Sequence, residues 1–162
     1  MKELNIIKQK KNVKIFLKDS ILTVQGPLGS LSQKLQITNV NDFLFISSEQ
    51  LDLFVKITKK LIKSVTYGWF IELNLNGIGY KSFKLDDKIA LDLGYSNLVL
   101  YKPKSNLKIK NFKNKLVLFC IDKDYLYNVA YLLRNYSVPD AYKGKGILFR
   151  NQNLKLKKKV KS

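Results

Sequence analysis

LDLFVKITKKLIKSVTYGWFIELNL, residues 51–75, changes its apolar period at Gly68. Before the glycine, apolar residues recur at helical spacing, at Leu51, Phe54, Ile57, Leu61, Ile62 and Val65. After it they alternate, as in a strand with one buried face, at Trp69, Ile71, Leu73 and Leu75. Ser47 and Gln50 just upstream predict a capping box. The stretch therefore predicts an amphipathic helix of about four turns, a stop at Gly68 and then a strand.

The sequence on both sides of this stretch repeats the same order of elements. From Val13 to Ile46 apolar residues alternate in short runs, which predicts an antiparallel meander. After Gly68 the alternation continues to Cys120, and Asp122 can then cap a second helix. Its apolar positions are Leu126, Val129, Ala130 and Leu133. This order predicts an α+β fold of two tandem small domains, residues 1–68 and 69–162, each an antiparallel sheet covered by one amphipathic helix.

The composition restricts the classes of partner. The 162 residues include 30 Lys plus Arg and 12 Asp plus Glu, for a formal net charge of +18, and 46% are hydrophobic. The chain is too apolar for a disordered basic tail, and a folded body this basic calls for a polyanionic partner, above all a nucleic acid. An anionic membrane surface competes less well, because no apolar run approaches the ~20 residues that span a bilayer. We expect no membrane partner.

Catalysis is disfavoured because the chain has no His, the usual general base and zinc ligand. Cys120 lies in an apolar run, where a small buried hydrophobe is expected. Asp86, Asp87 and Asp92 are more simply explained by a hairpin turn than by a metal site. We expect a protein that is not an enzyme and binds no metal or cofactor. Two alternatives stay open: a nucleic-acid enzyme holding magnesium on these aspartates, and a free DNA-packaging protein.

The nine residues YKGKGILFR, 142–150, combine glycines, cations and aromatic rings. Glycines let a backbone approach phosphates, lysines neutralise them, and rings can stack on bases. A turn followed by an edge strand is the structural alternative. From Ala141 to Ser162 the chain carries eight basic residues and no acid. This segment predicts nucleic-acid contacts at Tyr142, Lys143, Gly144, Lys145, Gly146, Arg150, Lys155 and Lys157.

Other basic and aromatic positions allow two interpretations each. Residues 102–115 contain six lysines and no acid, which fits either a solvated strand face or an auxiliary RNA-facing surface. Arg134 can complement the dipole of the second helix or reach a phosphate. We expect most of the tyrosines around that helix to pack in the core or at its border. They are Tyr125, Tyr127, Tyr131 and Tyr136.

YKGKGI, residues 142–147, resembles the carboxy-terminal signature of the large-subunit ribosomal protein family called L-six. Three further stretches resemble landmarks of that family in the same order: GPLGSLS at 26–32, GIGY at 77–80 and LDLGYS at 91–96. The resemblance covers nearly the whole chain. It implies two tandem copies of a small α+β domain, and binding of large-subunit rRNA near the sarcin-ricin region and the stalk base, mainly through the carboxy-terminal domain.

By this resemblance, rRNA contacts fall on residues 142–146 and on the turn Gly94, Tyr95 and Ser96. The sequence departs from the family pattern at 135–141, NYSVPDA, which keeps one proline and adds an acid before the signature, and at Asn97, where a histidine is usual. The resemblance further implies neighbouring large-subunit ribosomal proteins near the stalk base as partners, and no homo-oligomer.

The expected compartment follows from composition. The chain has 28 Lys and 2 Arg, a skew typical of AT-rich genomes, and its first residues lack signal or transit character. We expect a ribosome inside an organelle, a mitochondrion ahead of a plastid, with the cytoplasm of an AT-rich bacterium as the other possibility.

Overall fold

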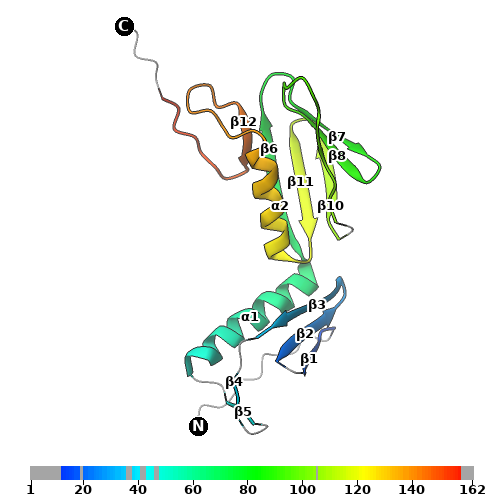
Figure 1. The fold of residues 1–162 in the computed structure, drawn as a ribbon, viewed down its shortest axis with the longest axis vertical. Coiled ribbons are helices and arrows are strands. Elements are labelled where there is room, and N and C mark those ends of the chain that lie inside the picture. The colour runs from blue at the N-terminus through cyan, green and yellow to red at the C-terminus, as the bar shows by residue number, and fades with distance from the viewer. Residues whose placement is uncertain are drawn as a thin grey trace. The chain divides into compact units, whose positions relative to one another are not determined.

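The computed structural model describes residues 12–18, 20–35, 38–40, 43–45, 48–104 and 106–157. The chain divides into two compact units, Met1–Gly68 and Trp69–Ser162 (Figure 1). Each unit combines antiparallel strands with one helix, which is the predicted fold class.

The first unit is a three-stranded meander packed against a helix. Its sheet has the order β1-β2-β3, and β4 and β5 form a separate hairpin. The elements are β1 (Lys14–Lys18), β2 (Ile21–Gly26), β3 (Gly29–Lys34), β4 (Thr38–Val40), β5 (Phe43–Phe45) and α1 (Ser48–Tyr67). With 20 residues, α1 is longer than the predicted four turns. The predicted cap Ser47 lies outside the described residues, as do Ile37 and Ile46.

Two glycines shape the packing of α1. Gly68 has a φ of 70° and its N–H donates to the Ser64 carbonyl at 2.9 Å, so the predicted helix stop is confirmed. A Cβ on Gly26 would lie 2.4 Å from Cγ1 of Val65, and the Leu28 N–H donates to the Val65 carbonyl at 3.2 Å. The turn at 26–29 is therefore seated on α1, and its glycine serves that contact.

The second unit contains two sheets and one helix. Their orders are β10-β11-β6-β12 and β7-β8-β9, all antiparallel. The elements are β6 (Trp69–Asn76), β7 (Lys81–Leu85), β8 (Lys88–Asp92), β9 (Val99–Tyr101), β10 (Lys108–Phe112), β11 (Lys115–Cys120), α2 (Lys123–Asn135) and β12 (Gly146–Phe149). Neither neighbour of β6 in the sheet follows it directly in the chain, so distant segments meet there.

One apolar core joins α2 to both sheets of this unit. The four predicted helix positions are all buried, together with alternate residues of β6 and β11 and the consecutive residues 89–91 of β8. Asp122 caps α2, its Oδ1 accepting from the N–H groups of Asp124 and Tyr125 at 2.9 and 3.3 Å. Cys120 is buried in this core, as predicted, and burial raises the pKa of its thiol.

The four tyrosines around α2, expected to pack in the core or at its border, do not all reach the core. Tyr125 packs there, but the side chains of Tyr127, Tyr131 and Tyr136 are exposed. Helix geometry accounts for Tyr127 and Tyr131: the stripe Leu126, Val129, Ala130 and Leu133 covers the sheet, and the positions that directly follow Leu126 and Ala130 turn to another face. Tyr136 lies beyond α2, as its C-cap residue.

Candidate nucleic-acid interface

The signature segment is a closed loop that continues as an edge strand. Asp140 holds the loop: its carboxylate accepts from the Tyr142 and Lys143 N–H groups at 3.2 and 3.0 Å. The Asp140 N–H donates to the Lys145 carbonyl, and the Gly144 N–H donates to the Asp140 carbonyl, both at 2.9 Å. The hydrogen bonds that the carboxylate accepts, first from the Lys143 N–H and then from the Tyr142 N–H, lower the pKa of Asp140.

This role of Asp140 was not predicted from the sequence. There the residue stands out only as an acid added before the signature. The available signal was an aspartate just ahead of a glycine-containing turn, where the side chain can accept from N–H groups two and three residues on. Two side-chain and two backbone hydrogen bonds of Asp140 close the loop, and Tyr142, Lys143 and Lys145 are exposed on it.

The two glycines of the signature meet requirements inside the protein. Gly146 is buried, and a Cβ there would lie 2.6 Å from Cα and 2.7 Å from the nitrogen of Pro139. Gly144 has a φ of 67°, which disfavours other residues, although a Cβ would meet only the Leu156 and Leu154 side chains, at 3.4 and 3.8 Å. Both therefore set the shape of the loop.

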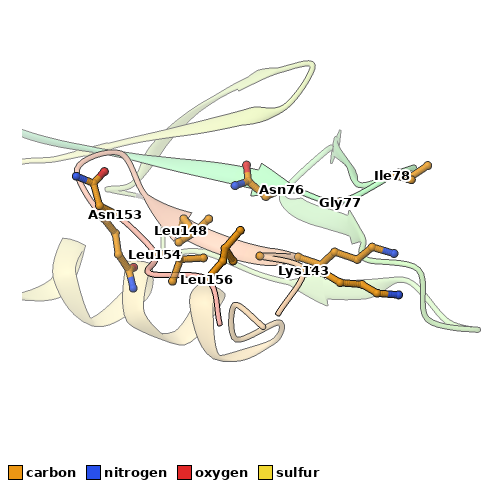
Figure 2. A pocket seen from close by; sticks show the side chains of 11 residues that line it. Asn76, Gly77, Ile78, Lys143, Leu148, Asn153, Leu154 and Leu156 are labelled. Carbon is orange, nitrogen blue, oxygen red and sulfur yellow. The ribbon is translucent and has the colours of Figure 1, made fainter. Parts of the chain in front are cut away.

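A groove of about 740 Å³ runs beside the loop. Figure 2 shows Asn76, Gly77 and Ile78 on one side of it and leucines from β12 and the following segment on the other, with Lys143 close by. Ile78 is 93% exposed. The predicted tail residues Lys155 and Lys157 are also exposed, and the Lys157 N–H donates to the Ala141 carbonyl at 2.9 Å. The tail therefore returns to the loop.

The turns at 77–80 and 94–96 lie at the same end of the unit as the loop. The Tyr80 hydroxyl is 3.3 Å from the Ser137 hydroxyl, and the Tyr95 hydroxyl donates to the Tyr136 carbonyl at 2.9 Å. The backbone carbonyl of Ser137 accepts a hydrogen bond from the Ile147 N–H, near the start of β12, at 2.9 Å. The bend predicted at 77–79 is confirmed: it joins β6 to β7. Three of the four resembling stretches thus converge.

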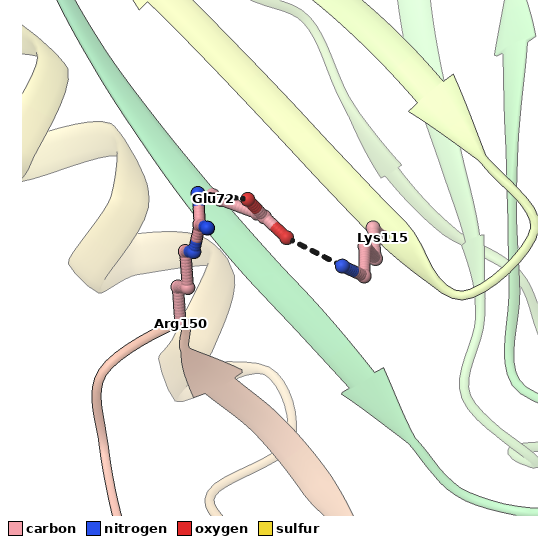
Figure 3. A network of polar contacts seen from close by, with 3 residues as sticks. All are labelled: Glu72, Lys115 and Arg150. Atoms are coloured by element: carbon pink, nitrogen blue, oxygen red, sulfur yellow. Dashed lines mark hydrogen bonds and ion pairs between the residues drawn. The ribbon is translucent and has the colours of Figure 1, made fainter.

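Arg150, a predicted contact, belongs to an ion-pair network apart from this groove (Figure 3). Its Nη1 donates to Oε2 of Glu72 at 3.1 Å, and Lys115 Nζ lies 2.9 Å from Oε1 of the same carboxylate. The two cations lower the pKa of Glu72, Lys115 having the larger effect. Sequence reasoning could not pair Glu72 with Lys115 or Arg150, because only the order β11-β6-β12 brings them together.

The basic run 102–115 is less isolated than its sequence indicates. Besides the pairing of Lys115 with Glu72, Asp86 and Asp87 line a groove of about 430 Å³ with Lys102, Lys104 and Lys108. Acids from other parts of the chain therefore lie beside these lysines, although the run itself contains none. The turn between β7 and β8 contains the two aspartates and lies beside the lysines of this run.

The magnesium alternative is not supported by the positions of its three aspartates. Asp86 sits in the hairpin turn with a φ of 39°, Asp87 follows it, and Asp92 lies at the far end of β8, where its Oδ1 accepts the Gly94 N–H at 3.3 Å. Within the described ranges no group of three or more metal-ligating side chains is found, and no helix is long and apolar enough to cross a membrane.

The chain is similar over most of its length to bacterial proteins, each named large ribosomal subunit protein uL6. It is 35% identical over 158 residues to the protein of a Hydrogenobaculum species, covering 90% of this chain and 87% of the relative. It is 31% identical over 157 residues to that of Chlorobium chlorochromatii, with 89% and 88% covered. It is 28% identical over 158 residues to that of Legionella pneumophila, with 88% of each covered.

No protein-family model matches the chain. The relatives nevertheless extend across both units, and identity above 30% over nearly the full length of each chain is sufficient to assign the family. The chain therefore belongs to the uL6 family of large ribosomal subunit proteins.

Proposed function

We propose that the chain binds large-subunit rRNA through the signature loop and the groove beside it, near the sarcin-ricin region and close to the stalk base. As a uL6 protein it is a structural constituent of the large ribosomal subunit and not an enzyme. One observation carries the proposal: the loop held by Asp140 presents Lys143 and Lys145 beside the turns that contain Ile78 and Tyr95.

Binding follows from charge and preorganisation. Each lysine that contacts a phosphate releases condensed counterions, which favours association at low salt. The loop is already closed by hydrogen bonds, so little conformational freedom remains to be lost on binding. Lys155, Lys157 and the exposed turn at 94–96 extend the surface, while buried Gly146 supports it from within.

The direct test measures affinity for an rRNA fragment spanning the sarcin-ricin region and stalk base as a function of salt. Lys143→Ala and Lys145→Ala should each weaken binding and flatten the slope of log K against log salt by about 0.9 for the lost phosphate contact. Lys18→Ala, at an exposed lysine of the first unit, is the matched control and should leave both unchanged. If Lys143→Ala and Lys145→Ala behave like the control, the signature only shapes a turn.

Sucrose-gradient fractionation of native lysate at high salt tests the assembly. The chain should co-sediment stoichiometrically with the large subunit and its proteins, and without ribosomes it should sediment as a monomer. Our proposal of a mitochondrial ribosome rests on the excess of 28 Lys over 2 Arg. The rRNA in the same fraction identifies the compartment: plastid or bacterial rRNA would refute it. A chain that follows DNA would instead support the DNA-packaging alternative.

A further inference from the structure

A second groove, of about 310 Å³, lies along the edge of the four-stranded sheet, away from the signature loop. We call it the edge groove and define it by Phe70, Glu72, Tyr127, Tyr131, Phe149 and Arg150. β12 pairs with β6 only as far as Phe149 opposite Leu73, whereas β6 begins at Trp69. The groove therefore occupies the place where β12 ends and β6 and α2 continue.

Aromatic rings form the walls of the edge groove. Tyr131 and Phe149 meet edge to face, with ring centroids 5.1 Å apart. The side chains of Phe70, Tyr127 and Tyr131 are 68%, 41% and 49% exposed. Three large rings left in water around one depression cost hydrophobic free energy that a planar partner would recover. The volume is at the lower end of the roughly 300–1,000 Å³ of small-molecule sites, which suits a single planar group.

Of the two arginines of the chain, Arg150 lines this groove and Arg134 lies near Phe149, one of its lining residues. The guanidinium carbon of Arg134 is 5.9 Å from the centroid of Phe149, and Arg150 lines the groove with its side chain 65% exposed. Lys123 adds a third cation, its Nζ 5.6 Å from the Tyr127 centroid. Every other basic residue in the chain is lysine, so the planar cations of the chain lie at or near this groove. A guanidinium can stack on a flat ring and hold a phosphate by a fork of N–H donors, which an ammonium cannot do.

We propose that the edge groove holds an unstacked base of a single-stranded RNA segment between the ring of Tyr131 on α2 and the free edge of β6 at Phe70, with the adjoining phosphate on Arg150. Rings that stack on bases beside arginines that hold phosphates are the usual means of single-strand recognition. The inference rests on the proposed function only in taking RNA as the partner, because its residues are separate from the signature loop.

Glu72 orients the phosphate ligand. Its carboxylate accepts a hydrogen bond from Nη1 of Arg150, which restrains the guanidinium, and the Arg150 side chain stays 65% exposed with further N–H donors. Lys115 on the other carboxylate oxygen offsets the charge of Glu72, so the network as a whole is positive. A cationic aromatic groove in a chain of net charge +18 favours an anion with flat rings over a peptide.

The test uses the full chain and a fluorescein-labelled oligoadenylate of ten nucleotides, with binding followed by fluorescence anisotropy. Tyr131→Leu and Phe70→Leu should each weaken binding about 5- to 100-fold, the usual range for losing one stacked base. The salt slope should not change, because no phosphate contact is removed. Phe70 is the second variant because it is more exposed than Tyr131 and makes no ring contact with Phe149, so replacing it spares the fold.

Phe112→Leu, an exposed ring on the opposite edge strand β10, is the matched control and should bind like the unaltered chain. Arg150→Lys keeps the charge but loses the planar fork, so it should weaken binding with little change in slope. Oligoadenylate affinity unaltered in both ring variants would overturn the proposal, as would an equal loss in Phe112→Leu. If the edge groove instead binds an extended peptide along β6, both ring variants should keep the oligoadenylate affinity of the unaltered chain.

The two proposals fail separately. Lys143→Ala should weaken binding of the folded rRNA fragment. In a chain that carries Lys143→Ala, Phe70→Leu should still weaken binding of oligoadenylate. If only one of the two substitutions weakens binding in its own assay, the surface that carries the other substitution does not bind RNA.

Discussion

At Gly146 a single missing side chain decides how the signature loop joins its strand. A Cβ there would sit 2.6 Å from Cα of Pro139, which is backbone and cannot rotate away, and the φ of 146° is rare for other residues. Gly146→Ala should therefore lower the free energy of unfolding by about 1–3 kcal/mol, measured by urea denaturation. Gly144→Ala is the comparison, since its Cβ meets only flexible leucine side chains. If both variants lose the same free energy of unfolding, the backbone at Pro139 shifts to accommodate a Cβ on residue 146 at little cost.

Asp140 gives the loop a dependence on pH. Its pKa in the folded chain is lowered, first by the Lys143 N–H and then by the Tyr142 N–H. A lowered folded pKa stabilises the protein above the unfolded value of about 3.9, and this stabilisation is lost as pH falls through the folded pKa. Urea midpoints between pH 7 and pH 3 should fall less steeply in Asp140→Asn than in the unaltered chain. Parallel curves would mean that the hydrogen bonds contribute nothing to stability.

At the scale of elements, the start of α2 depends on one carboxylate. Asp122 accepts two N–H groups of the first turn, which would otherwise lack partners in the helix. Asp122→Ala should lower the free energy of unfolding by about 0.5–2 kcal/mol, whereas Asp122→Ser, which keeps an acceptor, should lose much less. Thermal unfolding followed by circular dichroism compares the two. Equal stabilities of the variants would remove the capping role.

Helix ends differ in how well the sequence predicts them. Gly68 and Asp122 are recognisable because each supplies a conformation or an acceptor that a helix end requires. The start of α1 at Ser48 is where the predicted capping box of Ser47 and Gln50 puts it, whereas the apolar period alone begins only at Leu51. Polar residues can extend a helix beyond its apolar stripe, and the spacing of apolar residues does not reveal such an extension.

At the scale of the whole molecule, the second unit contains a complete core of its own. All the residues that form that core lie between Trp69 and Phe149. A fragment of residues 69–162 should therefore unfold cooperatively in urea and keep the salt-dependent affinity of the full chain for the rRNA fragment. A fragment that lacks a cooperative transition would show that the first unit is needed to complete the fold.

The amino-acid sequence alone is enough to predict the order of the elements, the buried faces of β6, β11 and α2, and the stops and caps between them. These depend on residues a few positions apart, so hydrophobic period and local hydrogen bonding suffice to predict them. Its motifs also pointed to the loop at 142–146 as a candidate site.

Which of these segments meet is seen only in the folded chain. Glu72 pairs with Lys115 and Arg150, Tyr95 reaches the carbonyl of Tyr136, and Asp86 joins the lysines of the 102–115 run, across separations that no local pattern encodes. The physical reason is that strand order and register follow from burial of the whole core at once. The same cooperative choice left the rings of Phe70, Tyr127 and Tyr131 together at a sheet edge.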